Sequence, residues 1–285
     1  CHGDMHLGNI ALIDGEILLF DGIEFNARMR WTDVLGDVGF LAMDLDDRGL
    51  TAHGNRFLSA YFERSGDYPA LHLLDFYRVY RAMVRAKVHA LRLQQAQARD
   101  ERDAILKEYR SYTDLAQRYT RARRPALCIT HGLSGCGKTT VAGKAVEAFG
   151  MFRIRSDVER KRLHGLAATE RSGAGIDEGI YGREATRATY ERLAGLANTV
   201  LRAGHSVVVD AAFLKSWQRQ RFADLAAHLN VPFAILDIDV PVATLRERLT
   251  RRQAQNADAS DAGVDVLEQQ LVTREPLGDD ELGKG

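Results

Sequence analysis

The stretch that decides the fold is His131-Gly132-Leu133-Ser134-Gly135-Cys136-Gly137-Lys138-Thr139-Thr140. It contains the spacing Gly-x4-Gly-Lys-Thr, and it lies between an apolar run at 126–130 and an amphipathic stretch at 138–149. Glycines in such a loop let successive backbone N–H groups point into one concavity, and the positive end of the following helix attracts anions. The stretch therefore predicts a phosphate-binding loop between a buried strand and a helix.

This loop is predicted to hold the phosphates of ATP. Lys138 would reach the β- and γ-phosphates, and the hydroxyl of Thr139 would ligate Mg²⁺. The predicted nucleotide contacts are Gly132, Leu133, Ser134, Gly135, Cys136, Gly137, Lys138, Thr139 and Thr140. Cys136 occupies a variable position, where it is either a small residue that fits or a thiol with a lowered pKa at a helix N-terminus.

Strands and helices alternate along the second half of the chain. Strands are predicted at 126–130, 152–156, 206–210 and 233–239, and helices at 138–149, 183–202, 216–229, 241–255 and 264–273. Such alternation predicts an α/β domain in which helices cover both faces of a parallel sheet, the three-layer arrangement of P-loop NTPases. The polar residues at 257–262 are predicted to form a loop.

Three acidic residues lie at the carboxyl ends of predicted strands, where parallel sheets bind ligands. Asp210 comes after three valines and is predicted to act on the metal side of the phosphate loop. Asp157 is predicted to act on the substrate side, and Asp239 is a weaker candidate of the same kind. Either a catalytic carboxylate or a simple helix cap would fit these positions.

Four arginines lie on the helix predicted at 241–255, namely Arg246, Arg248, Arg251 and Arg252. Arg248 and Arg252 are four residues apart and share a face, so they are predicted to close over the nucleotide and neutralise the transferring phosphoryl group. The alternative is a solvated helix face with Glu247 as an ionic partner.

Residues 125–277 resemble the AAA_33-type ATP-binding domain, which is related to gluconate kinase and chloramphenicol phosphotransferase. The resemblance is carried by the phosphate loop and by Ser156–Lys161, Val209-Asp210-Ala211 and residues 258–262. It implies ATP and Mg²⁺ as cofactors, Asp157 at the acceptor site and the arginines in a lid. Because relatives continue beyond 275–277 into another core strand, we expect the domain, 125–285, to be truncated at its C-terminus.

Residues 1–26 predict a β-hairpin with candidate catalytic residues at its open end. Asp14-Gly15 favours a two-residue turn between strands at 10–13 and 16–20, so paired positions sum to 29. This register brings Asn9 close to Asp21, with Asp4 upstream. An Asn and an Asp brought together, with a second Asp nearby, is an arrangement that kinases use.

The segments His2–Asn9 and Phe20–Asn26 resemble the catalytic loop and metal segment of aminoglycoside phosphotransferases and choline-kinase-like enzymes. This resemblance implies Asp4 as the base, Asn9 and Asp21 as metal ligands, and Asp37 as a brace. The fusion with a P-loop domain resembles bacterial bifunctional aminoglycoside phosphotransferase/ATP-binding proteins. Residues 1–122 would then be a mainly helical fragment of a protein-kinase-like C-lobe without its N-lobe, which we expect to be silent in a kinase assay.

Two long helices are predicted between about 55 and 122. One has an apolar face that we expect to be buried: Leu74, Tyr77, Tyr80, Met83, Val84, Val88 and Leu91. The other, at 101–120, would turn inward Ile105, Tyr109, Tyr112 and Leu115. The arginine run at 121–124, followed by Pro125, predicts a solvated linker between two domains.

Composition excludes several classes of partner. The 285 residues carry 39 basic and 39 acidic side chains, so charge gives no case for nucleic-acid or membrane binding. No apolar run approaches the roughly 18 residues needed to span a bilayer, and three scattered cysteines fit a reduced, cytoplasmic protein. The leading prediction is an ATP-dependent kinase of a small hydroxyl-bearing molecule. The alternatives are an ATP-binding regulatory module and, more weakly, a nucleic-acid-binding protein; the oligomeric state cannot be predicted.

Overall fold

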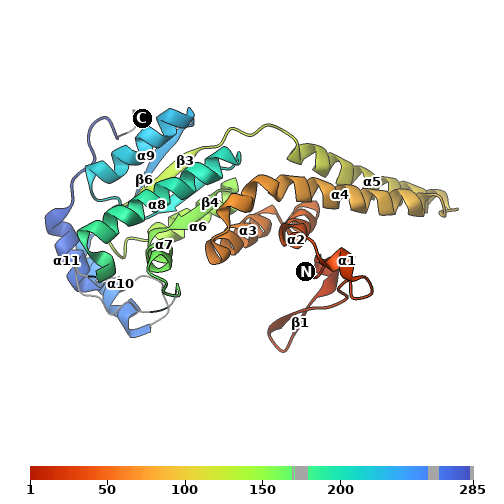
Figure 1. Ribbon diagram of the computed structural model, residues 1–285, viewed down its shortest axis with the longest axis horizontal. Coiled ribbons are helices and arrows are strands. Elements are labelled where there is room, and N and C mark those ends of the chain that lie inside the picture. The colour runs from red at the N-terminus through yellow and green to blue at the C-terminus, as the bar shows by residue number, and fades with distance from the viewer. Residues whose placement is uncertain (169, 171–178, 256–262, 283–285) are drawn as a thin grey trace. The chain divides into compact units, whose positions relative to one another are not determined.

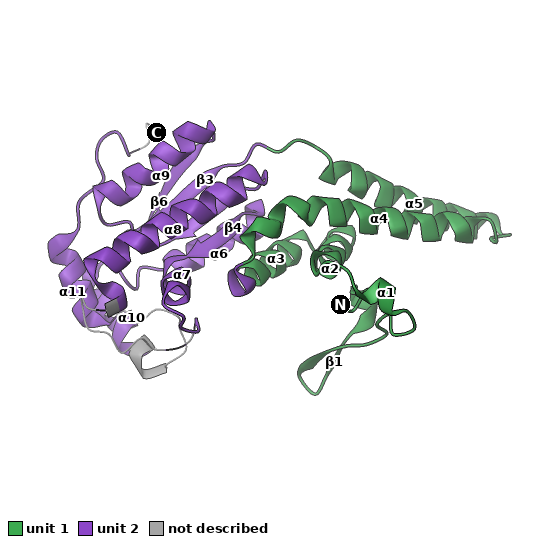
Figure 2. Cartoon of the chain, in the orientation of Figure 1, with its two compact units in different colours: residues 1–62, 67–123 green, residues 63–66, 124–285 purple. Residues whose placement is uncertain are grey.

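The computed structural model describes residues 1–168, 170, 179–255 and 263–282, and the chain forms two compact units (Figure 2). Unit 1 comprises residues 1–62 and 67–123, and unit 2 comprises residues 63–66 and 124–285. The predicted loop at 257–262 lies outside the described residues. Within the described ranges, no helix is both long enough and apolar enough to cross a membrane.

Unit 2 is built on a four-stranded parallel sheet in the order β4-β5-β3-β6 (Figure 1). The strands are β3 (Leu127–His131), β4 (Phe152–Arg155), β5 (Val207–Asp210) and β6 (Phe233–Asp237). β5 is buried along its whole length, as expected of an interior strand that is covered on both faces. The prediction of a parallel α/β sheet is therefore confirmed.

The helices of unit 2 are α6 (Lys138–Phe149), α7 (Ser156–Leu163), α8 (Arg183–Arg202), α9 (Ser216–Leu229), α10 (Val242–Gln255) and α11 (Val264–Thr273). The crossover through α6 runs across the sheet in one direction, and those through α8 and α9 run back. Because parallel crossovers are right-handed, α6 covers one face and α8 and α9 cover the other. Four of the predicted helices, at 138–149, 183–202, 216–229 and 264–273, have the observed bounds.

Two predicted strands were too long at their carboxyl ends. β4 stops at Arg155 because Ser156 begins α7, a helix that the sequence analysis did not predict. β6 stops at Asp237, and the following residues leave the sheet, although the amide of Ile238 still donates to the carbonyl of His131 at 2.9 Å. Asp157, predicted to follow a strand, therefore lies in the first turn of α7, and Asp239, predicted at the end of a strand, lies beyond the end of β6.

Unit 1 begins with the predicted hairpin, formed by β1 (Ile10–Ile13) and β2 (Glu16–Leu19). The pairing of Ile13 with Glu16 and of Ile10 with Leu19 confirms the expected register. Asp14 and Gly15 both have positive φ, 52° and 83°, which is the conformation of a type I′ turn. Local turn chemistry thus fixes the register of the hairpin.

The rest of unit 1 is helical, with α1 (Ala27–Arg30), α2 (Leu35–Asp47), α3 (Thr51–Ser65), α4 (Leu71–Leu93) and α5 (Arg99–Tyr119). Short 3₁₀ turns occur at Leu7–Asn9 and Tyr68–Ala70, and one occurs in unit 2 at Gly179–Tyr181. α4 packs along α5 and α2 around a core of Phe40, Met43, Ala82, Ala86, Tyr112, Leu115, Ala116 and Tyr119. Of the residues predicted to face inward on the second long helix, Ile105, Tyr112 and Leu115 are buried and Tyr109 packs against the core.

The apolar face predicted for α4 is only partly buried. The helix buries Leu74, Arg78, Ala82, Ala86 and His89, whereas Tyr80, Met83, Val88 and Leu91 are exposed. Small alanines let α4 approach its neighbours closely, and Arg78 is buried because it pairs with Asp46 and stacks 4.0 Å from the ring of Tyr119. Periodicity identified an apolar stripe but not the side of the helix that is covered.

Candidate functional site

The predicted phosphate loop connects the end of β3 to the start of α6, so its nine residues, 132–140, lie at the carboxyl edge of the sheet. Gly137 precedes α6 with φ of 102°, a left-handed conformation that favours glycine. This turn leaves the first N–H groups of α6 without intrahelical partners, and those groups form an anion site at the positive end of the helix.

Gly132 lies very close to the segment of the chain that follows β6. Its φ is 144°, and an added Cβ would lie 2.6 Å from the carbonyl oxygen of Ile238 and 2.7 Å from Sγ of Cys136. Real Cβ atoms are not found so near a backbone oxygen, so this position requires glycine. The loop is therefore held in shape by packing as well as by local torsion angles.

Lys138, the first residue of α6, folds back over the loop. Its ammonium group donates to the carbonyl oxygens of Gly132 at 3.0 Å and Leu133 at 2.8 Å, and lies 3.8 Å from Sγ of Cys136. These contacts hold the ammonium group against the backbone of the first two residues of the loop.

Thr139 and Asp210 meet at the other side of the loop. The Thr139 hydroxyl makes a side-chain hydrogen bond with the carboxylate of Asp210, which ends β5. Behind them, the hydroxyl of Thr130 donates to the carbonyl of Ala211 at 2.7 Å and accepts from its amide at 3.1 Å. This pair of bonds fixes the chain directly after Asp210, so two predicted magnesium ligands are held together.

The environment of Asp210 suits a divalent cation. Its residue is only 5% exposed, and its Oδ2 atom has no hydrogen-bond partner among the residues that the structure describes. Burial raises the pKa of the Asp210 carboxyl, while the Thr139 hydroxyl and Arg155, whose Nε lies 3.9 Å from Oδ2, act in the opposite direction. A buried carboxylate oxygen with a free lone pair fits a magnesium ligand.

No three His, Cys, Asp or Glu side chains of the described residues form a group that could hold a metal by themselves. Magnesium at Thr139 and Asp210 would therefore need phosphate oxygens or water as its other ligands, which is how it is bound in nucleotide sites. The residues present thus fit a nucleotide-linked Mg²⁺ and not a metal cage made by protein alone.

On the predicted acceptor side, Asp157 lies in the first turn of α7 and is half-buried. It acts electrostatically on Tyr190 of α8, whose hydroxyl accepts a hydrogen bond of 3.3 Å from the amide of Phe213 after β5. Burial is the main cause that raises the pKa of Tyr190 to about 12. Tyr190 thus links α8 to the segment after Asp210, and Asp157 lies near enough to Tyr190 to act on it electrostatically.

Sequence reasoning missed two residues here. In the sequence, Tyr190 is only one residue of the helix predicted at 183–202. Its contact with Phe213 depends on the crossover from β4 to β5. Gln270 of α11 accepts a hydrogen bond of 2.8 Å from the amide of Ser134, so it holds the phosphate loop from outside. A polar residue on the apolar face of the helix at 264–273 was the only available signal.

The arginines of α10 have different surroundings. Arg248 donates to the carbonyl of Gly135 at 3.4 Å, so its guanidinium reaches the phosphate loop. Arg246 instead pairs with Glu268 of α11 at 2.8 Å on the surface. The side chain of Arg252, also predicted to be catalytic, lies outside the described residues.

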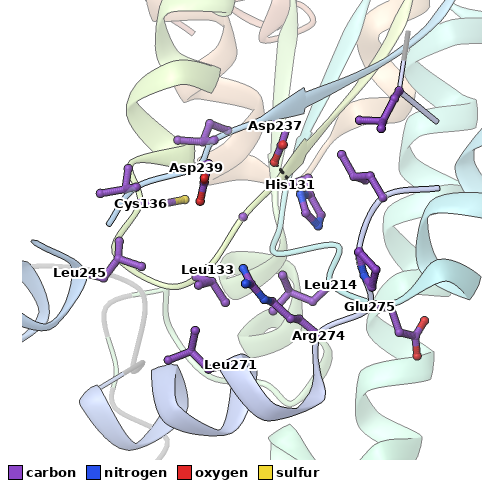
Figure 3. A pocket seen from close by; sticks show the side chains of 16 residues that line it. His131, Leu133, Cys136, Leu214, Asp237, Asp239, Leu245, Leu271, Arg274 and Glu275 are labelled. Atoms are coloured by element: carbon purple, nitrogen blue, oxygen red, sulfur yellow. Dashed lines mark hydrogen bonds and ion pairs between the residues drawn. The ribbon is translucent and has the colours of Figure 1, made fainter. Parts of the chain in front are cut away.

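A cavity of about 570 Å³ borders the first half of the phosphate loop (Figure 3). Leu133, Cys136 and Leu271 contribute to its apolar wall, and His131 and Asp239 contribute polar atoms. His131 pairs through Nδ1 with Asp237 at 2.7 Å, and its buried Nε2 has no hydrogen-bond partner within the described parts of the chain. Asp239 thus lies in this cavity, whereas Asp210 meets Thr139.

In unit 1, the predicted N-terminal residues gather around Asn9. Its side-chain amide donates to Oδ2 of Asp4 at 3.2 Å and to the carbonyl of Asp21 at 3.5 Å. Asp37 accepts from the amides of His2 at 2.7 Å and Gly3 at 2.9 Å, and so holds the loop from behind. The structure brings Asp4, Asn9 and Asp21 together at the open end of the hairpin, as the register predicted.

Comparison with known proteins gives a family match and several similar proteins. Residues 127–277 match the AAA_33 family, which is described as an AAA domain. A gluconokinase of Gluconobacter oxydans is 31% identical over 160 residues, which cover 55% of this chain and 80% of that protein. Among solved structures, a sugar kinase from Janibacter is 24% identical with a TM-score of 0.42, covering 55% of this chain and 82% of its own.

A further match runs through both units. An uncharacterized protein of Mycobacterium tuberculosis is 32% identical over 259 residues, which are 91% of this chain and 51% of that protein. A protein of Mycobacterium bovis matches to the same extent. The chain therefore spans about half the length of the curated relatives that match both of its units.

Proposed function

The chain belongs to the AAA_33 family, and we propose that it is an ATP-dependent phosphotransferase that acts on a small hydroxyl-bearing molecule through residues 125–285. The observation that carries this proposal is the hydrogen bond between Thr139 and the buried carboxylate of Asp210, at the end of a loop that Lys138 overlies. These are the groups that hold magnesium and the terminal phosphates in P-loop enzymes. The match to a gluconokinase supports a small acceptor.

Lys138 would exchange its two carbonyl partners for phosphate oxygens when ATP binds. Thr139 and Asp210 would hold Mg²⁺, which supplies charge neutralisation on the β- and γ-phosphates. Arg248, already within 3.4 Å of the Gly135 carbonyl, is placed to add positive charge beside the transferring group. All four side chains would therefore help to neutralise the negative charge of the phosphates, either directly or by holding Mg²⁺. Stabilising this charge is the main requirement of phosphoryl transfer.

Asp157 would accept the proton of the acceptor hydroxyl. It lies in the first turn of α7 and acts electrostatically on Tyr190, whose hydroxyl accepts from the amide of Phe213 in the segment after Asp210, which supports this role. A carboxylate outside the metal pair is free to act as a general base. The identity of the acceptor depends on the shape of this region, for which gluconate, other sugars and amino alcohols are the first candidates to test.

The test is a panel of sugars, sugar acids, aminoglycosides and amino alcohols, each scored for acceptor-dependent release of ADP. Native protein should turn over at least one of them, and Lys138→Ala should not. Lys144→Ala, an exposed lysine on the same helix, is the matched control and should behave as native. Equal ADP release from native and Lys138→Ala proteins would show that the phosphate site has been assigned wrongly.

A second proposal concerns unit 1, since Asn9 contacts Asp4 directly and lies beside Asp21. We propose that residues 1–122 are a kinase-like catalytic segment in which Asp4 is the base and Asn9 and Asp21 are metal ligands. Mn²⁺ titration of the Asp210→Asn protein with nucleotide present would test it. Binding that disappears with Asp21→Asn supports this segment as a metal site, and binding that is unchanged contradicts it.

A cytoplasmic location is also a proposal. It is supported by the three cysteines, Cys1, Cys128 and Cys136, which are all free thiols. The near balance of charge gives no support to nucleic-acid binding.

A further inference from the structure

Arg155, the last residue of β4, lies between two carboxylates. Its Nε atom is 3.9 Å from Oδ2 of Asp210, and its Nη1 atom is 3.8 Å from Oε1 of Glu63. All three side chains are largely buried, with exposed fractions of 15% for Arg155, 4% for Asp210 and 17% for Glu63. Charges that are removed from water are poorly screened, so both carboxylates attract the same guanidinium.

Neither of these two contacts of Arg155 is a hydrogen bond, because a nitrogen and an oxygen that are hydrogen-bonded lie about 2.7–3.2 Å apart. The attraction of the guanidinium to Asp210 therefore leaves Oδ2 without a hydrogen-bond partner among the described residues. That carboxylate oxygen is balanced by a nearby positive charge and can still accept another ligand.

Glu63 belongs to the segment 63–66 of unit 2, and arginines hold it in place. Residues two apart on a strand share a face, so Arg153 reaches the same carboxylate as Arg155. Arg153 donates to Oε2 of Glu63 from Nε at 3.1 Å and from Nη2 at 2.9 Å. Arg162 of α7 donates to the Glu63 carbonyl at 2.6 Å. Oε1 takes part in none of these bonds, so it is the oxygen that faces Arg155.

We propose that Arg155 and Glu63 are positioning residues for the metal side of the phosphate loop. Arg155 is the counter-ion of Asp210 while no divalent cation is bound, and Glu63 receives the guanidinium when such a cation reaches Asp210. This inference rests on the proposed function, because it takes Asp210 as a ligand of Mg²⁺. Neither residue touches the reacting atoms.

Electrostatic repulsion is the physical reason for the exchange. A guanidinium and a divalent cation beside one buried carboxylate repel each other, and this repulsion is stronger in a buried site than in water. A shift of about 1 Å toward Oε1 would bring Nη1 of Arg155 within hydrogen-bond distance of Glu63. Because Arg153 bonds Oε2, the receiving carboxylate is already held in place.

The two residues should therefore have opposite effects on metal affinity. In Glu63→Gln the guanidinium loses its second anion and competes with the metal, so affinity should fall by about 10-fold. In Arg155→Met the competing cation is absent, so the metal should bind at least as tightly as in native protein. In the double variant, the loss caused by Glu63→Gln should shrink to about 2-fold or less. A purely structural role would weaken binding in every variant.

The experiment is a Mn²⁺ titration of the whole chain, followed by electron paramagnetic resonance with a non-hydrolysable ATP analogue present. An Asp21→Asn background removes the metal site proposed in unit 1. Glu281→Gln is the matched control and should bind as native, since Glu281 also makes two bonds to one arginine, Arg219, at 2.6 and 2.9 Å and is 19% exposed. Glu63→Asp keeps the negative charge and should retain most of the affinity.

Native affinity in Glu63→Gln, or weaker binding in Arg155→Met than in native protein, would overturn the proposal. Should Glu63→Gln fail to fold, Arg155→Lys and Arg155→Met still decide it: the lysine keeps a competing cation and should bind Mn²⁺ as native, and the methionine should bind it no less tightly. Asp210→Asn in the same titration separates the two levels of the account. Mn²⁺ binding that survives Asp210→Asn contradicts both the proposed function and this inference, whereas binding that is lost there but unchanged in Glu63→Gln contradicts this inference alone.

Discussion

The ammonium group of Lys138 lies 2.8 Å from the carbonyl oxygen of Leu133, so the lysine of the phosphate loop bonds the loop's own backbone. Nucleotide binding must replace this bond, and the bond to Gly132, by bonds to phosphate oxygens. Since phosphate carries a full negative charge and a carbonyl does not, the exchange favours the bound state. The loop's own carbonyl groups therefore hold its cation in place.

Removing that cation gives the first prediction. Lys138→Ala should weaken binding of an ATP analogue by about 10- to 100-fold, the range expected for a lost charge-assisted hydrogen bond. Isothermal titration with magnesium present measures the affinity. Lys144→Ala should bind as native, and an equal loss in both variants would point to a general effect of positive charge on α6 instead.

Gly132 and Gly143 form a matched pair for the loop geometry. Gly132→Ala should destabilise the fold by about 1–3 kcal/mol and abolish nucleotide binding, because its Cβ would lie 2.6 Å from the Ile238 carbonyl. Gly143→Ala adds a Cβ whose nearest neighbour is 3.9 Å away, within α6. It should stabilise by about 0.5–1 kcal/mol. Thermal unfolding of both variants measures the difference, and a neutral Gly132→Ala would contradict the tight packing.

Asp210→Asn should raise the stability of the fold while it abolishes activity. Burial raises the pKa of Asp210, so ionisation of this carboxyl in the folded, nucleotide-free chain costs stability. The amide removes that cost, and the midpoint of unfolding should rise by about 2–4 °C for each kcal/mol that is relieved. Acceptor-dependent ADP release should fall below detection.

The pH dependence of this gain follows from the sign of the shift. Between the ordinary carboxyl pKa and the raised pKa of folded Asp210, the folded chain binds more protons than the unfolded chain, so native stability falls as pH rises. The advantage of Asp210→Asn should therefore be absent in acid and grow to a plateau above the folded pKa. An advantage that is largest in acid would contradict the account.

Asp157→Asn distinguishes a kinase from an ATP-binding regulatory module. If Asp157 takes the proton of an acceptor hydroxyl, the variant should lose about 100-fold or more in kcat while its affinity for ATP stays as native. Steady-state kinetics and nucleotide titration measure the two quantities. Turnover that is insensitive to Asp157→Asn would favour the regulatory alternative.

Arg248 and Arg246 lie on the same helix and differ in their partners. Arg248→Ala should lower kcat by roughly 100-fold, because a donor at the phosphate loop is lost. Arg246→Ala should have little effect, since it only breaks an exposed ion pair with Glu268. Equal losses in the two variants would favour the reading of α10 as a solvated basic face.

Much of the fold could be predicted because local signals agree with tertiary structure in unit 2. Glycines and a lysine fix the loop after β3, and valines fill β5, which is buried on both faces. The hairpin register followed from Asp14-Gly15 alone. Where one short segment determines its own geometry, sequence was sufficient.

The rest could not be predicted because it depends on which surfaces meet. α4 turns Ala82 and Arg78 inward, since close helix contact and pairing with Asp46 outweigh the burial of Tyr80 and Met83. Tyr190 and Gln270 join the site only after the crossovers bring α8 to the segment that follows β5 and α11 to the phosphate loop. Periodicity in the sequence indicates that a helix has an apolar face, but only tertiary packing determines which element covers that face.

The most direct test of the central claim is a crystal soaked with a non-hydrolysable ATP analogue and magnesium. The terminal phosphates should lie against the amides of 132–139, with Nζ of Lys138 moved from the Leu133 carbonyl to a phosphate oxygen and the metal beside Thr139 and Asp210. An analogue bound elsewhere, with Lys138 still on the Leu133 carbonyl, would contradict the assignment of this chain as a phosphotransferase.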